Sequence, residues 1–269
     1  MRVAAAIVAV LATLLLAPLP VAAAGDPALY RCTVIVTGQG EETRLPGLSR
    51  CLATVLAKVS GDARLVDDRG VTTLAAEAAD LVAGFRYRDR MEGIPAHDEQ
   101  GSRDRPYDLT VDFDPAAVDA ALAKLGRKPW TAPRPAVAVL AMVTIGDRSF
   151  ALARDGSLGR DMREALAAAA ETSGLAVVLP TVAALAGAGP AAFTDRAARD
   201  RVMAAAGGAV ALAGRLDWSE ADLGWTASWR FDDAGVVHAW RVTGVSFDAA
   251  FRNGLAGLAL VLSGNGTSD

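Results

Sequence analysis

Apolar residues recur at every second position over residues 30–36, which predicts a strand with one buried face. From residue 42 to residue 59 their spacing changes to three and four positions, which predicts a helix that Ser60 and Gly61 end. The same reasoning predicts a short helix over residues 71–82, strands near residues 84–90 and 107–113, and a helix over residues 116–125. We therefore expect an α+β domain over residues 25–126.

Three prolines within residues 127–135 interrupt this pattern and predict an extended linker. Continuous apolar runs in the second half are typical of strands buried on both faces, and they fall at residues 136–145, 175–179 and 209–216. Helical spacing separates them at residues 157–172, 180–185 and 194–206, and a hairpin at residues 225–245 and a helix at residues 248–262 close the chain. The fold class expected is α/β with two domains, each a mixed sheet packed with helices. The second domain spans residues 136–262, and residues 263–269 form a tail.

The first residues carry the pattern of a secretory signal peptide. A single Arg2 precedes an uncharged apolar run, and Pro18 and Pro20 precede three alanines that end at Ala24. The uncharged run also approaches the ~20 residues that span a bilayer, but the two prolines favour cleavage over an anchor. Residues 1–24 are therefore expected to direct export to the periplasm, with a soluble product and no membrane insertion after cleavage.

The formal net charge is −4, and the chain has no basic block. Binding to phosphate backbones requires such a block, so nucleic acid is not an expected partner. The start of a dinucleotide fingerprint at Gly38 and Gly40 lacks its third glycine and is interpreted as a tight turn before a helix. We expect no cofactor and no metal site.

The chain has two cysteines, and the expected compartment allows disulfides to persist. Cys32 lies on the apolar face of the first strand, and Cys51 borders the apolar face of the helix that follows. A strand packed on that helix would bring the two sulfurs together, so we expect a Cys32–Cys51 bridge. The alternative is a pair of small buried thiols.

Alternating carboxylates mark the strand over residues 107–113. Asp108, Asp112 and Asp114 lie on its polar face, where close carboxylates can perform acid/base chemistry or hold a hard cation. An antiparallel neighbour at residues 84–90 would place three arginines opposite them. The face is then a ladder of ion pairs, which could serve as a partner-binding surface. Both interpretations remain open.

Other candidate residues favour structural roles. The two histidines, His97 and His238, provide few ligands for zinc and few bases for a nucleophile. His97 falls in a polar loop, His238 is expected to be a partly buried residue near Trp229, and Ser157 is expected to be a helix N-cap. Four tryptophans gather around the hairpin and either pack under the last helix or stack a sugar or peptide: Trp218, Trp225, Trp229 and Trp240.

The order of several short motifs resembles the exported Gram-negative family called domain of unknown function 2066. The motifs are Tyr30 with residues 34–36, residues 58–62, residues 85–87, residues 109–114, and Trp130 followed by Arg134 and Pro135. The run at residues 207–216 with the hairpin and final helix is similar to the α/β domain in the N-terminal part of TolB and of envelope lipoproteins. The first resemblance implies no catalytic residues, and the second is one of fold alone.

These observations favour a non-catalytic periplasmic accessory or adaptor protein that binds an envelope protein partner. The first alternative is a hydrolase or cation-dependent enzyme that uses Asp108, Asp112 or Asp114. The second alternative is a glycan- or peptide-binding module with an exposed tryptophan face.

Overall fold

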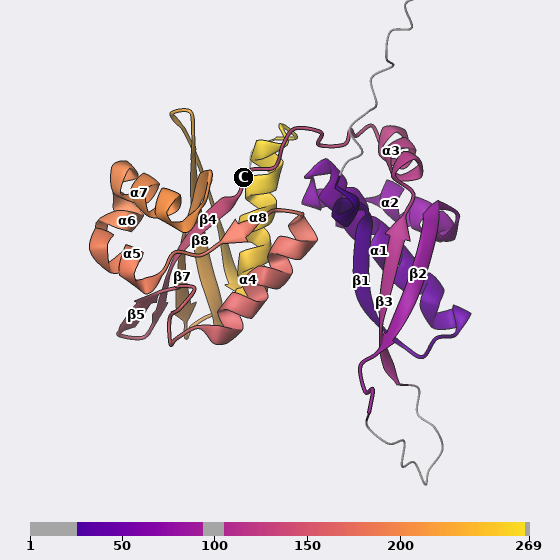
Figure 1. The fold of residues 1–269 in the computed structure, drawn as a ribbon, viewed down its shortest axis with the longest axis horizontal. Helices are drawn as coiled ribbons and strands as arrows, with labels where there is room; N and C mark the ends of the chain where they lie inside the picture. The colour runs from indigo at the N-terminus through magenta and orange to yellow at the C-terminus, as the bar shows by residue number, and fades with distance from the viewer. Residues whose placement is uncertain (1–25, 94–104, 267–269) are drawn as a thin grey trace, which may run out of the picture.

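The computed structural model of the chain describes residues 26–93 and 105–266. The expected signal peptide at residues 1–24 and His97 lie outside the described residues. The described chain forms two lobes side by side, joined by an extended segment that follows α3 (Figure 1). The expected α/β class is confirmed, with helices packed on both sheets; the second sheet is mixed as expected, but the first is antiparallel throughout.

The first lobe is an antiparallel sheet of three strands in the order β1-β3-β2. Its elements along the chain are η1 (Pro27–Tyr30), β1 (Arg31–Thr37), α1 (Glu41–Ser60), η2 (Ala63–Asp67), α2 (Arg69–Leu74), η3 (Ala75–Leu81), β2 (Val82–Asp89), β3 (Pro106–Phe113) and α3 (Pro115–Lys124). The long helix α1 covers one face of the sheet, and the core lies between them. The other face carries the polar positions of all three strands.

Local sequence explains where these elements begin and end. Gly61 adopts a φ of 77° at the end of α1, a left-handed conformation that glycine adopts without steric cost. The Asp114 carboxylate accepts a hydrogen bond from the Ala117 N–H at 2.8 Å and so caps α3. Cys32 and Cys51 form the expected disulfide, with their Cα atoms 5.4 Å apart. The bridge fastens β1 to the middle of α1.

The second lobe is a six-stranded mixed sheet in the order β5-β4-β7-β8-β9, with β6 also paired to β4. Its elements are β4 (Val137–Ile145), β5 (Arg148–Ala151), α4 (Arg160–Ser173), β6 (Val177–Val178), α5 (Val182–Ala188), α6 (Ala191–Thr194), α7 (Arg196–Ala206), β7 (Val210–Ser219), β8 (Gly224–Asp233), β9 (Val236–Val245) and α8 (Phe247–Leu262). Strands β4, β6 and β7 are parallel, and the others pair antiparallel.

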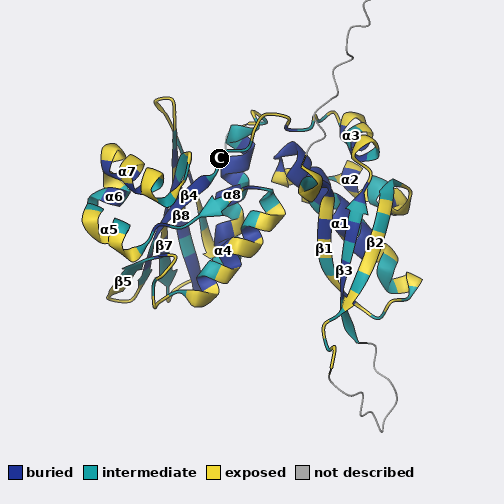
Figure 2. Ribbon diagram, viewed as in Figure 1, coloured by how far each residue is buried: buried dark blue, intermediate teal, exposed yellow. Residues whose placement is uncertain are grey.

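Helices cover both faces of this second sheet. Alternate residues of β4 enter two different cores: Val139 packs with α4 and α8, and Leu140 packs with α5, α6 and α7. The helices α4 and α8 lie on the side that faces the first lobe (Figure 1). Figure 2 shows the buried residues concentrated along the strands and the inner sides of these helices. The second lobe therefore presents two helices, and not a sheet edge, to the first.

Three sequence predictions need correction. Residues 71–82 do not form one helix but the short α2 followed by the 3₁₀ segment η3, because only Val71 and Ala78 are buried there and the segment has no continuous apolar face. The strand β5 was not predicted, although Gly146, with a φ of 60°, starts a tight turn before it. Ser157 is not an N-cap, because α4 begins after Gly159, which provides no side-chain cap.

Candidate functional site

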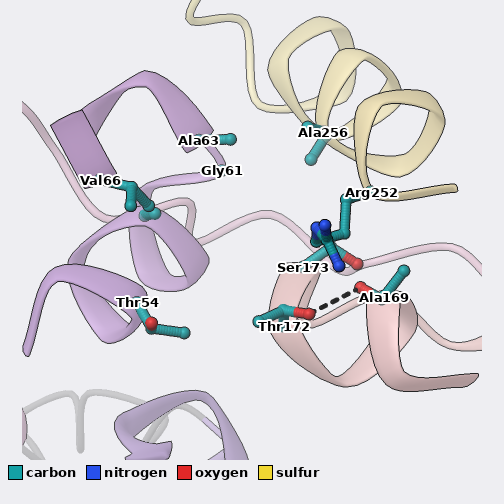
Figure 3. Close-up of a pocket in the computed structure, with 11 residues that line it drawn as sticks. Thr54, Gly61, Ala63, Val66, Ala169, Thr172, Ser173, Arg252 and Ala256 are labelled. Atoms are coloured by element: carbon teal, nitrogen blue, oxygen red, sulfur yellow. Dashed lines mark hydrogen bonds between the residues drawn. The ribbon is translucent and has the colours of Figure 1, made fainter. Parts of the chain in front are cut away.

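A cleft of about 620 Å³ lies between the two lobes. The first lobe contributes the outer edge of β1 and part of the polar sheet face, and the second lobe contributes α4 and α8. A smaller apolar hollow of about 230 Å³ adjoins it and shares Thr54, Ala169, Thr172 and Arg252 with the cleft. Figure 3 shows this hollow, with Thr54 and Val66 on one side and Ala256 and Arg252 on the other. The two hollows form one continuous candidate site.

The polar sheet face next to the cleft is a ladder of ion pairs. Asp108 accepts hydrogen bonds from Arg88 Nε at 3.1 Å and from Arg90 Nη1 at 2.8 Å. Asp112 accepts hydrogen bonds from Arg86 Nη1 at 3.2 Å and from Arg31 Nε at 2.5 Å. The expected pairing of the β2 arginines with these aspartates is therefore confirmed.

The third aspartate lies apart from this ladder. Asp114 follows β3 and caps α3, so the three carboxylates predicted as one group do not come together. Arg31 was missed in the sequence, because nothing in the pattern showed that β3 would be the central strand with β1 as its other neighbour. Its only sequence signal is the alternation that places it on the polar side of β1.

The pairing determines the charge state of Asp108. Burial alone would raise the pKa of this carboxyl, but the hydrogen bonds and charges of Arg90 and Arg88 outweigh burial and lower the pKa below its usual 3.8. Asp108 is therefore ionised at neutral pH, with both oxygens engaged by arginines. A general acid at neutral pH requires a raised pKa, so this arrangement is typical of a structural carboxylate.

The cleft carries a surplus of positive charge in a chain whose net charge is −4. Its lining includes five cationic side chains and three carboxylates. These are Arg31, Lys58, Arg88, Arg90 and Arg252, with Asp108, Glu171 and Asp248. Such local surplus favours an anionic or acidic occupant.

The side of the cleft opposite β1 is formed largely by small side chains. The face of α4 that lines the cleft carries Ala165, Ala168 and Ala169, whose short side chains leave room in front of β1. Arg252 of α8 projects toward the end of α4 near Thr172 and Ser173 (Figure 3). The structure shows no carboxylate paired with Arg252 among the described residues. Its guanidinium is thus available to a ligand in the cleft.

The lobes are held together above the cleft by Arg134. Its Nη2 donates to the carbonyls of Lys58 at 2.7 Å and Val59 at 3.2 Å, in the last turn of α1. Its Nη1 donates to the carbonyls of Ser173 at 3.3 Å and Gly174 at 3.4 Å, where α4 ends. The guanidinium therefore joins the C-terminal ends of two helices, one from each lobe.

The Arg134 side chain is half-buried against Trp130. Burial lowers the pKa of its guanidinium to about 10, and its Cζ lies 4.2 Å from the centroid of the Trp130 ring. The backbone N–H of Trp130 donates a further bond to the Val59 carbonyl at 2.9 Å. A Cβ added at Gly174 would lie 2.7 Å from the Lys58 side chain, so the glycine that ends α4 also lets the lobes approach.

The tryptophan cluster is mostly internal. Trp225, Trp229 and Trp240 are buried, and Trp229 packs against Gly214 of β7 and Gly254 of α8. Trp218 is half-buried, and its indole N–H donates to Glu220 at 2.8 Å. The packing of the buried tryptophans under the final helix, one of the two interpretations, is therefore the observed one.

His238 is half-buried as expected, but its cross-strand partner is Phe231 and not Trp229. The two rings stack with their centroids 6.1 Å apart. The prediction misplaced His238 because it assumed a longer loop, whereas the turn consists only of Ala234 and Gly235 and sets the register of the two strands.

Within residues 26–93 and 105–266, the structure shows no group of three or more acidic, histidine or cysteine side chains arranged to hold a metal ion.

None of the helices in the described part of the chain has the length and apolar character needed to cross a bilayer.

Comparison with known proteins bears mainly on the first lobe. Neither the curated proteins nor the solved structures include a match to this chain. The resemblance to domain of unknown function 2066 is wrong, and no TolB-like match supports the second resemblance. The motifs behind the first of these resemblances are short. Residues 58–62, for example, are a helix end with a left-handed glycine, which many unrelated helices share. Residues 23–131 instead match the model of another family, described as a domain of unknown function (DUF8605).

Proposed function

We propose that the protein is an exported, non-catalytic accessory protein that binds a segment of an envelope protein partner in the cleft between its lobes. The observation that carries this proposal is the cationic surplus of the cleft lining, five cationic side chains against three carboxylates, of which Asp108 is already paired with two arginines. A surplus of positive charge beside a wall of small apolar side chains favours recognition of an acidic segment.

The state of the aspartates supports binding over chemistry. Asp108 and Asp112 each accept hydrogen bonds from two arginines, so both oxygens of each carboxylate are engaged within the sheet. An enzyme that used them would first have to break these ion pairs. A binding surface, by contrast, does not require these ion pairs to be broken.

Site-specific photocrosslinking in cells tests this proposal. A photoreactive amino acid at Thr33, within the cleft, should yield a discrete adduct with a periplasmic protein. The same amino acid at Val236, which is 59% exposed on the far hairpin, provides the matched control. Adducts of equal yield at both positions, or none at Thr33, would contradict binding in the cleft.

Export is tested separately. N-terminal sequencing of protein from the periplasmic fraction should begin at or near Gly25. A chain that retains Met1 and stays with the cytoplasm would overturn the location and, with it, the class of partner.

A further inference from the structure

We infer that β1 binds the partner by strand addition, and that the incoming segment is extended and acidic. This inference rests on the proposed function and specifies how the cleft would recognise its occupant. The carrying observation is the free edge of β1, because five consecutive residues of this strand, Arg31 to Ile35, line the cleft.

The register identifies which backbone groups face the cleft. In an antiparallel pair, alternate residues direct both their N–H and C=O to the neighbour, and the residues between direct them away. The Arg31 carbonyl accepts from Lys58 Nζ and the Ile35 carbonyl accepts from Arg50 Nη2, so these odd-numbered residues face away from β3. Thr33 is also an odd-numbered residue of β1, so its backbone groups face the same way. Its N–H and C=O, together with the Ile35 N–H, therefore point into the cleft.

These three groups have no hydrogen-bond partner within the part of the chain that the structure describes. The two neighbouring carbonyls are protected by cationic side chains, which is a common way to prevent an edge strand from pairing indiscriminately. The protection stops at Thr33. What remains open is a short site, since five residues of β1 span about 17 Å at ~3.3 Å per residue.

The pleat then specifies side chains of the incoming segment. A strand beside β1 places alternate side chains next to Arg31 on the polar sheet face, the face that also carries Arg88 on β2. The intervening side chains point to the other side, toward Thr54 and the alanines of α4. Acidic residues suit the positions on the polar sheet face, and small residues suit the positions that point toward α4. The occupant is accordingly a segment in which carboxylates alternate with small side chains.

Fluorescence anisotropy with synthetic peptides tests the inference on the full mature chain. The probe is a fluorescein-labelled heptapeptide in which aspartate alternates with alanine. Two comparison peptides replace every aspartate with lysine, or carry N-methyl groups on the backbone amides that would pair with β1. We expect at least tenfold weaker binding for both, because the first reverses the charge and the second removes the strand's donors.

Variants of the protein locate the contact. Thr33→Pro removes the N–H that faces the cleft without breaking a backbone bond to β3, although it also removes the hydroxyl that contacts Thr110, and it should weaken binding of the aspartate peptide at least tenfold. Thr37→Pro changes a residue of the same parity outside the cleft lining and should leave binding within twofold. The N-methylated peptide keeps the test decisive if Thr33→Pro does not fold.

The outcomes separate the inference from the proposed function. Equal binding of the aspartate and N-methylated peptides overturns strand addition, and equal binding of the lysine peptide overturns the acidic specificity. Absence of binding by every peptide also overturns the inference. In each of these cases a crosslink confined to Thr33 would still support a partner in the cleft.

Discussion

Removing the side chain that joins the lobes should uncouple them. Arg134→Met keeps the length and apolar stem of the side chain but removes all five N–H donors and the charge. The four carbonyls that Arg134 contacts belong to the ends of α1 and α4, so the loss falls on the contact between lobes and not on either core.

The magnitude follows from two opposing contributions. The bond to the Lys58 carbonyl at 2.7 Å is worth about 1.5 to 3 kcal/mol as a hydrogen bond to a charged group, and the three longer bonds add about 0.5 to 1 kcal/mol each. Stacking on Trp130 adds about 1 to 2 kcal/mol. Against these, burial that lowers the pKa of the guanidinium to about 10 costs roughly 2 to 3 kcal/mol after screening by solvent. The expected net loss in the free energy of unfolding is about 1 to 6 kcal/mol.

Urea unfolding followed by two signals measures both the loss and its location. Tryptophan fluorescence reports chiefly the second lobe, which holds four of the five tryptophans, and far-ultraviolet circular dichroism reports both lobes. The signals should coincide in the wild type and separate in Arg134→Met. Arg196→Gln, which changes an exposed arginine of α7, should alter stability by less than about 0.5 kcal/mol. Coincident transitions in Arg134→Met, or a loss no larger than that of the control, would refute this account of Arg134.

Three further experiments test the fold. Gly254→Ala would place a Cβ 2.5 Å from the Trp229 ring and should lower stability by about 1 to 3 kcal/mol, whereas Gly187→Ala, with open space around it in α5, should raise it by about 0.4 to 1 kcal/mol; equal Tm values would contradict the packing. Reduction of the Cys32–Cys51 bridge, verified by intact mass after alkylation, should cost roughly 3 kcal/mol in urea unfolding, and an unchanged midpoint would exclude that contribution. Because the folded-state pKa of Asp108 lies below 3.8, its contribution to stability is present at neutral pH and declines as the pH falls below about 4. The Tm of Asp108→Asn should therefore fall less over that range than the Tm of the wild type, and parallel curves would oppose this.

The parts of the structure that the sequence predicts are those set by local periodicity. Alternation over residues 30–36 and 107–113 placed the disulfide and the charge ladder correctly, because a strand's two faces follow from its residues alone. The order of strands does not follow in this way. Arg31 pairs with Asp112 only because β3 lies between β1 and β2.

The cleft was beyond prediction for a related reason. It depends on contacts between side chains and backbone carbonyls across the lobes, such as those of Arg134 and of Asn265, whose Nδ2 donates to the Ser60 carbonyl at 2.8 Å. Every residue has a carbonyl, so such contacts leave no complementary pair of residue types in the sequence. The proline-rich residues 127–135 predicted a linker between two domains, but not the contacts that the two lobes make with each other.

The negative C-terminal ends of α1 and α4 affect both the contact between the lobes and the binding of an acidic segment in the cleft. The helices α1 and α4 direct their C-terminal ends, each equivalent to roughly half a negative charge, toward the same place. An acidic segment that approached these ends would be repelled if they were bare. Arg134 lies between them and Lys58 lies beside them, so the negative ends are neutralised from within. The same cation that fixes the lobes thus makes the cleft tolerant of carboxylates. Consequently, under conditions where Arg134→Met is still folded, the aspartate peptide should bind it more weakly than the wild type, even though Arg134 does not line the cleft.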